Sequence, residues 1–314
     1  MTAPSFAKSP VGVTADPVLV AGATGFVGRR LAMRLRASGT EVRCLARKPE
    51  AAADLRAAGC EVVQGDILDP ESLRAALDGT ESAYYLVHSM GRGSDGDFAR
   101  RDVEGAGNFA EAASGAGSGR IIYLGGLGEA TSEHLRSRME TAEALASGNV
   151  PLTHLRAAVV IGSGSESFRT IYWLVKRLPA MVTPRWTTIR TQPIGIDDVV
   201  EYLALSLHLQ PAGDLEIEVG GPDVTTYGGM MDEVARAMGR RPPLRVRVPV
   251  LSPSLSARWI GLVTPVDTGV ARPLVEGLTT ETVVRDPSGM ALFEHRPGSL
   301  GAAMRDAVAG MQDR

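Results

Sequence analysis

The stretch Val18-Leu-Val-Ala-Gly22-Ala-Thr-Gly25-Phe-Val-Gly28 decides the fold. An apolar run leads into three glycines spaced three residues apart, and a helical pattern follows through Arg36. In this context the first glycine allows a sharp turn, the second lets the backbone approach a pyrophosphate, and the third lets helix pack on strand. An ordinary strand-to-helix turn is the alternative. The prediction is a pyrophosphate site at a helix N-terminus, with these cofactor contacts: Gly22, Thr24, Gly25, Phe26, Val27 and Gly28.

The residues from Pro17 to Gly162 alternate short β-branched runs with segments of helical period. Such alternation is typical of βαβ units feeding a parallel sheet, so we expect an α/β fold with a doubly wound parallel Rossmann sheet. One helix should start at Asp69-Pro70, because Asp caps free N–H groups and Pro needs none, and end at Asp78-Gly79. The expected strands are 18–21, 41–46, 61–64, 82–87, 120–124 and 152–161.

The chain divides into three parts on this pattern. Residues 1–17 are expected to be a flexible tail, 18–162 the dinucleotide-binding domain, and 163–314 a smaller, irregular substrate-binding region. Within the last part we expect a helix over 168–178, a strand and helix over 193–209 that return to the Rossmann core, a strand at 216–219 and a helix at 227–238. The proline-rich segment 240–285 should form a small irregular subdomain closing over the ligand.

Composition excludes several function classes. The 314 residues carry 33 basic and 36 acidic side chains, a net charge of -3, so no field that would recruit nucleic acid is expected. No run approaches the roughly 18 apolar residues that span a bilayer. Two cysteines, Cys44 and Cys60, are too few for a metal site or a disulfide framework. We expect a cytoplasmic monomer or homodimer that takes a small-molecule substrate and no metal.

Basic residues follow the second expected strand, and they indicate which of the two nicotinamide cofactors binds. No Asp or Glu stands between Glu41 and Glu50 to hold the adenosine ribose hydroxyls, whereas Arg47 and Lys48 suit a 2′-phosphate. NADP(H) is therefore favoured over NAD(H), with two solvated basic residues as the alternative. Asp66-Ile67 follows the third strand, where the short Asp66 side chain can accept a hydrogen bond from the adenine amino group, or the segment can form a simple turn.

Four motifs together resemble a known family: the glycine stretch 22–28, Gly65-Asp66, Leu86-Val-His88-Ser-Met90 and Gly220-Gly-Pro-Asp223. The chain is similar to the atypical short-chain dehydrogenase/reductases, and more narrowly to the NmrA/YbjT-like NAD(P)-binding group, which is related to the NADH dehydrogenase 39 kDa subunit family. The resemblance covers nearly the whole chain after the tail. It implies NAD(P) binding and, in members that reduce carbonyls, a Ser after the fifth strand and a Tyr-x-x-x-Lys on the next helix.

This sequence departs from that catalytic pattern at each position. Gly125-Gly126 stand where the resemblance implies Ser, His134 replaces Tyr and Arg138 replaces Lys. His134 could donate a proton, since imidazole titrates near neutrality, and Arg138 could bind the nicotinamide ribose or a substrate anion. The alternative is that both are solvent-facing residues of a protein that has lost catalysis. Tyr123, within the fifth strand, is expected to be a packed core residue.

Leu86 and His88 end the fourth strand, whose carboxyl end the doubly wound fold delivers to the cofactor cleft. His88 is thus a further cofactor-binding and catalytic candidate, with a loop histidine bonded to backbone as the alternative; His154, inside a strand, should be structural. An apolar substrate pocket is expected from an aromatic-rich segment, Phe168, Tyr172, Trp173, Met181 and Trp186, although aromatics at helical spacing are more often core.

Two functions from different classes follow from these residues. The first is an NADP(H)-dependent reductase that transfers hydride to a carbonyl or conjugated group of an apolar small molecule, with His134 as the acid. The second is a non-catalytic NAD(P)-binding redox sensor or assembly subunit, which the loss of the Ser, Tyr and Lys allows. An isomerase or epimerase that uses the nicotinamide transiently is compatible with the same fold.

Overall fold

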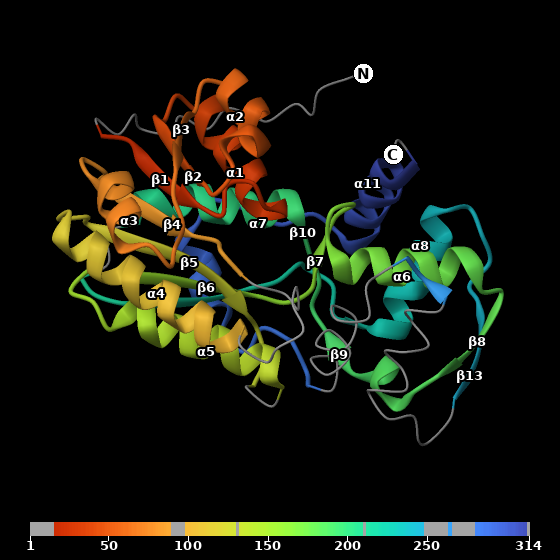
Figure 1. Ribbon diagram of the computed structural model, residues 1–314. Coiled ribbons are helices and arrows are strands. Elements are labelled where there is room, and N and C mark those ends of the chain that lie inside the picture. The colour runs from red at the N-terminus through yellow and green to blue at the C-terminus, as the bar shows by residue number, and fades with distance from the viewer. Residues whose placement is uncertain are drawn as a thin grey trace.

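A seven-stranded parallel sheet forms the larger of two lobes (Figure 1). The computed structural model describes residues 16–88, 98–129, 132–209, 212–247, 263–265 and 280–312. The strands are β1 (Val18–Ala21), β2 (Val42–Ala46), β3 (Glu61–Gln64), β4 (Ser82–Tyr85), β5 (Arg120–Gly126), β6 (Leu152–Ala157) and β11 (Leu215–Val219). Their order in the sheet is β11-β6-β5-β4-β1-β2-β3. Strands β2 and β3 are therefore added on one side of β1, and the later strands on the other side, starting with β4. The predicted Rossmann sheet is confirmed.

Helices cover both faces of this sheet. One face packs against α1 (Phe26–Ala37), α2 (Ala53–Ala57) and α7 (Ile196–Leu205), and the other against α3 (Pro70–Leu77), α4 (Phe98–Gly115) and α5 (Glu133–Ala146). Each layer buries its own apolar cluster, around Leu31 and Val199 on the first face and around Phe109 and Leu145 on the second. Short 3₁₀ turns complete this lobe: η1 (Pro49–Ala52), η3 (Ser206–His208) and η4 (Pro287–Leu292).

The start of α3 follows its predicted signals. The Asp69 side chain accepts a hydrogen bond of 3.1 Å from the backbone N–H of Glu71, and Pro70 occupies the first turn. The helix ends at Leu77, and Gly79 takes a positive φ of 66° that suits glycine. Capping chemistry read from the sequence therefore places this helix within one residue at each end.

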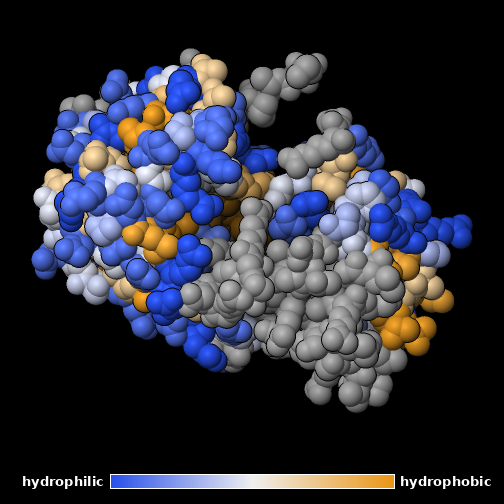
Figure 2. Space-filling view, in the orientation of Figure 1, coloured by the Kyte–Doolittle hydropathy of each residue, from blue (hydrophilic) through white to orange (hydrophobic). Residues whose placement is uncertain are grey.

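The smaller lobe is built from helices and two-stranded pairs. Its core lies between α6 (Glu166–Arg177), α8 (Tyr227–Ala237) and α11 (Leu300–Gln312), with Phe168, Met230 and Met304 fully buried. The pairs are β7 (Val160–Ile161) with β10 (Ile194–Gly195), β9 (Arg190–Thr191) with β12 (Thr225–Thr226), and β8 (Ala180–Thr183) with β13 (Leu244–Arg247), and η2 is Arg185–Thr188. Exposed Val182, Leu244 and Val246 form an apolar patch at the far end of this lobe (Figure 2).

Three expected elements differ from those observed. The single strand expected over 152–161 is two, because the chain leaves the main sheet after Ala157 and Val159 O accepts from Ile194 N instead. The strand expected at 216–219 within the substrate-binding region is present as β11, but it belongs to the main sheet, where it pairs with β6 at the edge. The sequence predicts that the helix within 193–209 is capped near Asp197, but the cap of α7 is Gly195.

The expected N-terminal tail and the expected proline-rich subdomain are only partly described by the structure. Residues 1–15 of the expected tail and 248–262 and 266–279 of the expected subdomain lie outside the described residues. The segment 193–209 places α7 against α1, on the face of the main sheet that α2 also covers. Among the described helices, none is long and apolar enough to cross a membrane.

A buried ion pair fastens α7 to α1. Arg34 donates to both carboxylate oxygens of Glu201, at 2.8 and 3.0 Å, and its side chain is only 7% exposed. We expect Arg34→Ala to lower the free energy of unfolding by about 3 kcal/mol, because the Glu201 carboxylate loses its partner in a poorly solvated position. Arg74→Ala, which removes an exposed pair with Glu71, should leave it nearly unchanged. Urea denaturation measures both, and equal losses would contradict the buried pair's role.

Candidate active site

A cleft of about 770 Å³ lies along the carboxyl ends of the parallel strands, where the chain reverses direction between β1 and β4. Ligands of open α/β sheets bind at this position. The cleft starts at the glycine-rich loop, passes the ends of β2 and β3, and continues between α5 and the smaller lobe. Residues from both lobes line it, among them Gly22, Arg47, Asp66, Leu86, His88, Gly125, Arg138, Val160, Ser165, Glu166, Tyr227 and Thr282.

The glycine-rich loop has no room for side chains at its first and last glycines. A Cβ on Gly22, whose φ is +84°, would stand 2.5 Å from the carbonyl oxygen of Leu86, and one on Gly28 would stand 2.3 Å from the carbonyl oxygen of Gly22. The N-terminus of α1 therefore comes close to β1 and β4 and turns its free N–H groups toward the cleft. Such a cradle fits a dinucleotide pyrophosphate.

The remaining loop residues connect the cofactor side of the cleft to the smaller lobe. Thr24, Phe26 and Val27 all line the cleft, as predicted for cofactor contacts. The Phe26 ring lies against Gly164, where a Cβ would be 2.4 Å from the ring, and the Arg30 guanidinium stacks 4.5 Å from the ring centroid. The loop that leads into α6 thus packs directly on the glycine-rich loop.

At the adenosine end, only one of the two basic residues predicted to contact the cofactor lies at the cleft. Arg47 lines the cleft and is exposed, whereas Lys48 is not among the lining residues. Asp66 and Ile67 both line the cleft, and the Asp66 carboxylate also accepts from the N–H of Leu68 at 3.0 Å. The turn and the ligand contact, which were alternatives for Asp66, are therefore compatible.

His88 forms a pair with a buried carboxylate. Its Nδ1 lies 3.2 Å from Oδ2 of Asp102 on α4, and Asp102 is 2% exposed. Burial lowers the pKa of His88, the nearby Arg138 lowers it further, and Asp102 only partly opposes them. A neutral ring that donates from Nδ1 to Asp102 keeps a lone pair on Nε2. His88 therefore lines the cleft as a ring held in place by Asp102.

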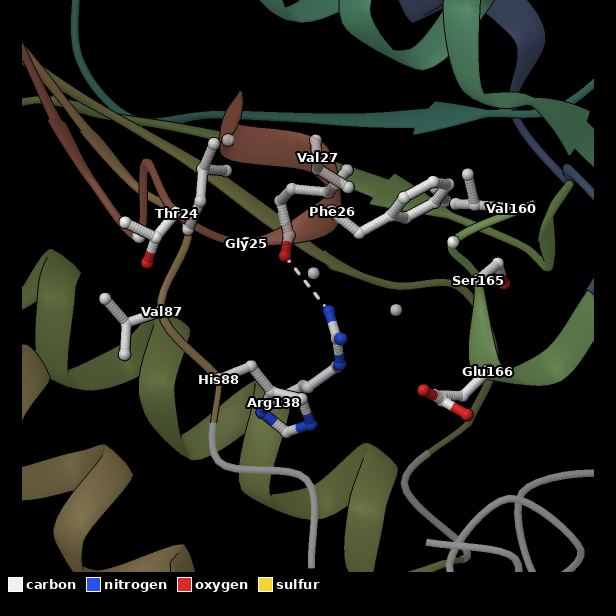
Figure 3. Close-up of a pocket in the computed structure, with 18 of the residues that line it drawn as sticks. Thr24, Gly25, Phe26, Val27, Val87, His88, Arg138, Val160, Ser165 and Glu166 are labelled. Atoms are coloured by element: carbon white, nitrogen blue, oxygen red, sulfur yellow. Dashed lines mark hydrogen bonds between the residues drawn. The ribbon is translucent and has the colours of Figure 1, made fainter. Parts of the chain in front are cut away.

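Arg138 extends from α5 into the cleft, with the glycine-rich loop on one side and Ser165 and Glu166 on the other (Figure 3). Its Nη1 donates to the carbonyl oxygen of Leu124 at 3.1 Å, which fixes the guanidinium at the end of β5. Its Nε is buried and makes no hydrogen bond within the described part of the chain. The guanidinium thus presents a permanent positive charge to the cleft.

The absence of a Ser after β5 has a packing cause. A Cβ on Gly125 would stand 2.2 Å from Nε2 of His154, which lies on the neighbouring strand β6. His154 stacks on Tyr123 at 5.1 Å, and its Nδ1 lies 3.4 Å from Glu216 on β11. Burial lowers the pKa of His154 to about 4, so the ring is neutral near pH 7. Tyr123 is buried, as expected for a core residue.

The expected substrate residues do not line the cleft. Phe168, Tyr172 and Met181 are buried in the core of the smaller lobe, and Trp173 and Trp186 pack against it. Because α6 turns its aromatic stripe toward α8 and α11, only its first turn, with Glu166 and Ser167, reaches the cleft. The packing gives no support to an aromatic substrate pocket made of these five residues.

The proposed acid is only partly placed. His134 stands in α5, four residues before Arg138 and so on the same side of the helix, but its side chain lies outside the described residues. The sequence did not single out several residues that line the cleft: Arg101, Val159, Val160, Ser165, Glu166, Ser167, Tyr227 and Thr282. The cap and first turn at Ser165-Glu166 are readable from the sequence, but Thr282 is brought in from more than a hundred residues away.

Comparison with known proteins agrees with this geometry. Residues 22–162 match the family described as NAD(P)H-binding. This part of the chain is an NAD(P)H-binding domain. The match begins at Gly22, directly after β1, and spans β2 to β7, which include the strands on the cofactor side of the cleft. The resemblance drawn from the sequence motifs is confirmed.

The NAD(P)H-binding domain has named relatives of two kinds. The ceramide reductase of Caulobacter vibrioides is 27% identical over 235 residues, covering 74% of this chain and 73% of the relative. A photosystem II assembly factor of Guillardia theta is 36% identical over 119 residues, 38% of this chain and 37% of the relative. The triphenylmethane reductase of Citrobacter sp. in complex with NADP(H) shares the fold, with a TM-score of 0.72 over 93% of this chain and 99% of that chain at 19% identity.

The contact between Gly125 and His154 predicts a reciprocal pair of substitutions. We expect Gly125→Ser to lower the free energy of unfolding by about 2 kcal/mol, because the added atoms force the imidazole from its place. In the background of His154→Ala the same change should cost less than about 0.5 kcal/mol, since the ring is gone. Chemical denaturation of the four proteins of the cycle gives the coupling. If the losses in unfolding free energy of the two substitutions were additive, a contact other than that with His154 would exclude a side chain at Gly125.

Proposed function

We propose that this protein is an NADP(H)-dependent reductase of small molecules. The observation that carries the proposal is the continuous cleft, which runs from the glycine-rich loop past Arg138 to a wall supplied by the smaller lobe. In this proposal the first part holds the dinucleotide, and the part beyond Arg138 holds the second molecule. When bound, NADPH supplies a hydride for a carbonyl or conjugated carbon. The reductase names among the relatives support this chemistry.

The chain's own residues divide the remaining tasks. In this proposal Arg138 faces the acceptor oxygen and stabilises the negative charge that develops there; it gives no proton, because a guanidinium stays protonated. His88, held by Asp102, supplies a polar part of the cleft wall near Arg138. His134, one helical turn before Arg138, then donates the proton to the oxygen.

The choice of NADP(H) depends on Arg47. We expect Arg47→Ala to weaken NADPH binding by roughly 10- to 100-fold, because one charge-assisted contact to the 2′-phosphate is lost, and to leave NADH binding unchanged. Lys48→Ala is the matched control: the residue is adjacent but does not line the cleft, so its loss should change neither affinity more than about twofold. Calorimetric titration of both nucleotides measures this. Equal losses for NADPH and NADH would refute the assignment.

A second function has a specific observation in its favour. The Ser, Tyr and Lys that the family resemblance implies are absent, and one relative carries the name of an assembly factor. A protein that binds NAD(P)H without turnover and signals redox state to a partner would fit both facts. Such a sensor would bind the cofactor as tightly as a reductase would.

Turnover distinguishes the two functions. We expect steady oxidation of NADPH with at least one member of a panel of ketones, enones and quinones, and Arg138→Gln should lower kcat by roughly 100-fold, about 3 kcal/mol of transition-state stabilisation. His134→Ala should abolish the alkaline limb of the pH profile of kcat if His134 is the acid. NADPH binding without oxidation of any acceptor would favour the sensor.

A further inference from the structure

One acidic side chain lies at the substrate end of the cleft among the residues that the structure describes. Within this described part, Asp66 and Glu166 are the acids that line the cleft, and Asp66 lies at the adenosine end. Glu166 lies on the opposite wall, and its carboxylate is directed toward Arg138 and His88 across the open space (Figure 3). A carboxylate here is not a contact for the pyrophosphate, since like charges repel. Its electrostatic partner must come from the protein or from the substrate.

Within the protein, Glu166 pairs with Arg169 through only one of its two carboxylate oxygens. Arg169 donates to Oε1 of Glu166 at 2.7 Å. Oε2 makes no hydrogen bond to any part of the chain that the structure describes, and the Glu166 side chain is 22% exposed, toward the cleft. The adjacent lining residues Ser165 and Ser167 bear hydroxyls. The wall opposite Arg138 therefore offers acceptors and hydroxyl groups.

Two comparable pairs elsewhere show what is particular to Glu166. Glu71 with Arg74 on α3 and Glu233 with Arg236 on α8 have the same three-residue spacing. Neither lines the cleft, and the Glu71 side chain is 82% exposed. Glu71, like Glu166, stands in the first turn of its helix, where the helix dipole favours a carboxylate. Helix stabilisation thus explains the presence of an acid at both positions, but of these acids only Glu166 lines the cleft.

We propose that Glu166 selects the substrate: the molecule reduced here carries a hydrogen-bond donor, a hydroxyl or an ammonium group, on the side remote from its acceptor carbonyl. The carbonyl oxygen faces Arg138 and the donor group faces Oε2 of Glu166. An anionic group at that end is repelled. The inference deepens the proposed reductase function and replaces the expected apolar substrate with a polar one.

Four matched ketones test the selection: cyclohexanones with an ammonium, hydroxyl, methyl or carboxylate group at C4. Their binding to the protein saturated with NADP⁺ is measured by calorimetry, and their turnover with NADPH is measured in parallel. The ammonium compound should bind at least tenfold more tightly than the carboxylate, with the hydroxyl compound above the methyl, because hydrogen bonds to an ionised acceptor are the stronger kind. In turnover the difference should appear in KM more than in kcat.

Two variants separate recognition from helix stability. Glu166→Gln should reduce the preference for ammonium over carboxylate to about twofold or less and leave the affinity for NADPH unchanged. Glu71→Gln removes an equivalent first-turn acid and should keep the full preference. An undiminished preference in Glu166→Gln, or failure of all four ketones to bind the NADP⁺-loaded protein, would overturn the inference. Selective binding without turnover would support Glu166 as the selecting residue and refute the reductase.

Discussion

The close approach of the glycine-rich loop to β4 is the constraint on which the rest of the structure depends. With a side chain at Gly22 or Gly28, the start of α1 would have to move away from Leu86 and from its own strand. The gap between β1 and β4 is where the sheet reverses its order, so this is also where the cleft opens. The packing of α1 on the sheet and the position of its anion-binding N–H groups beside the cleft thus both require that Gly22 and Gly28 lack side chains.

Local patterns were sufficient to predict the cofactor half of the protein. The strands from β1 to β5, the cap of α3 and the lining role of Arg47 and Asp66 all follow from short stretches whose chemistry is nearly independent of their surroundings. Leu86 and His88 follow in the same way, because parallel strands always bring their carboxyl ends to one edge.

The substrate half could not be predicted in this way, because long-range packing determines it. An aromatic stripe on α6 gives the same sequence signal whether it faces a ligand or a core, and here α8 and α11 bury it. The last strand of the main sheet, β11, is too short to distinguish from a local hairpin strand before its pairing with β6 is known. The lack of a Ser at Gly125 has its cause in His154, 29 residues later in the sequence.

The contact of Phe26 with Gly164 has a thermodynamic consequence. The ring belongs to the glycine-rich loop and packs on the segment that leads into Ser165 and Glu166. A ligand that shifts the ring from one side also changes the packing on the other side. Any free energy used in that shift alters the affinity for the second ligand, and such a linkage acts equally in both directions.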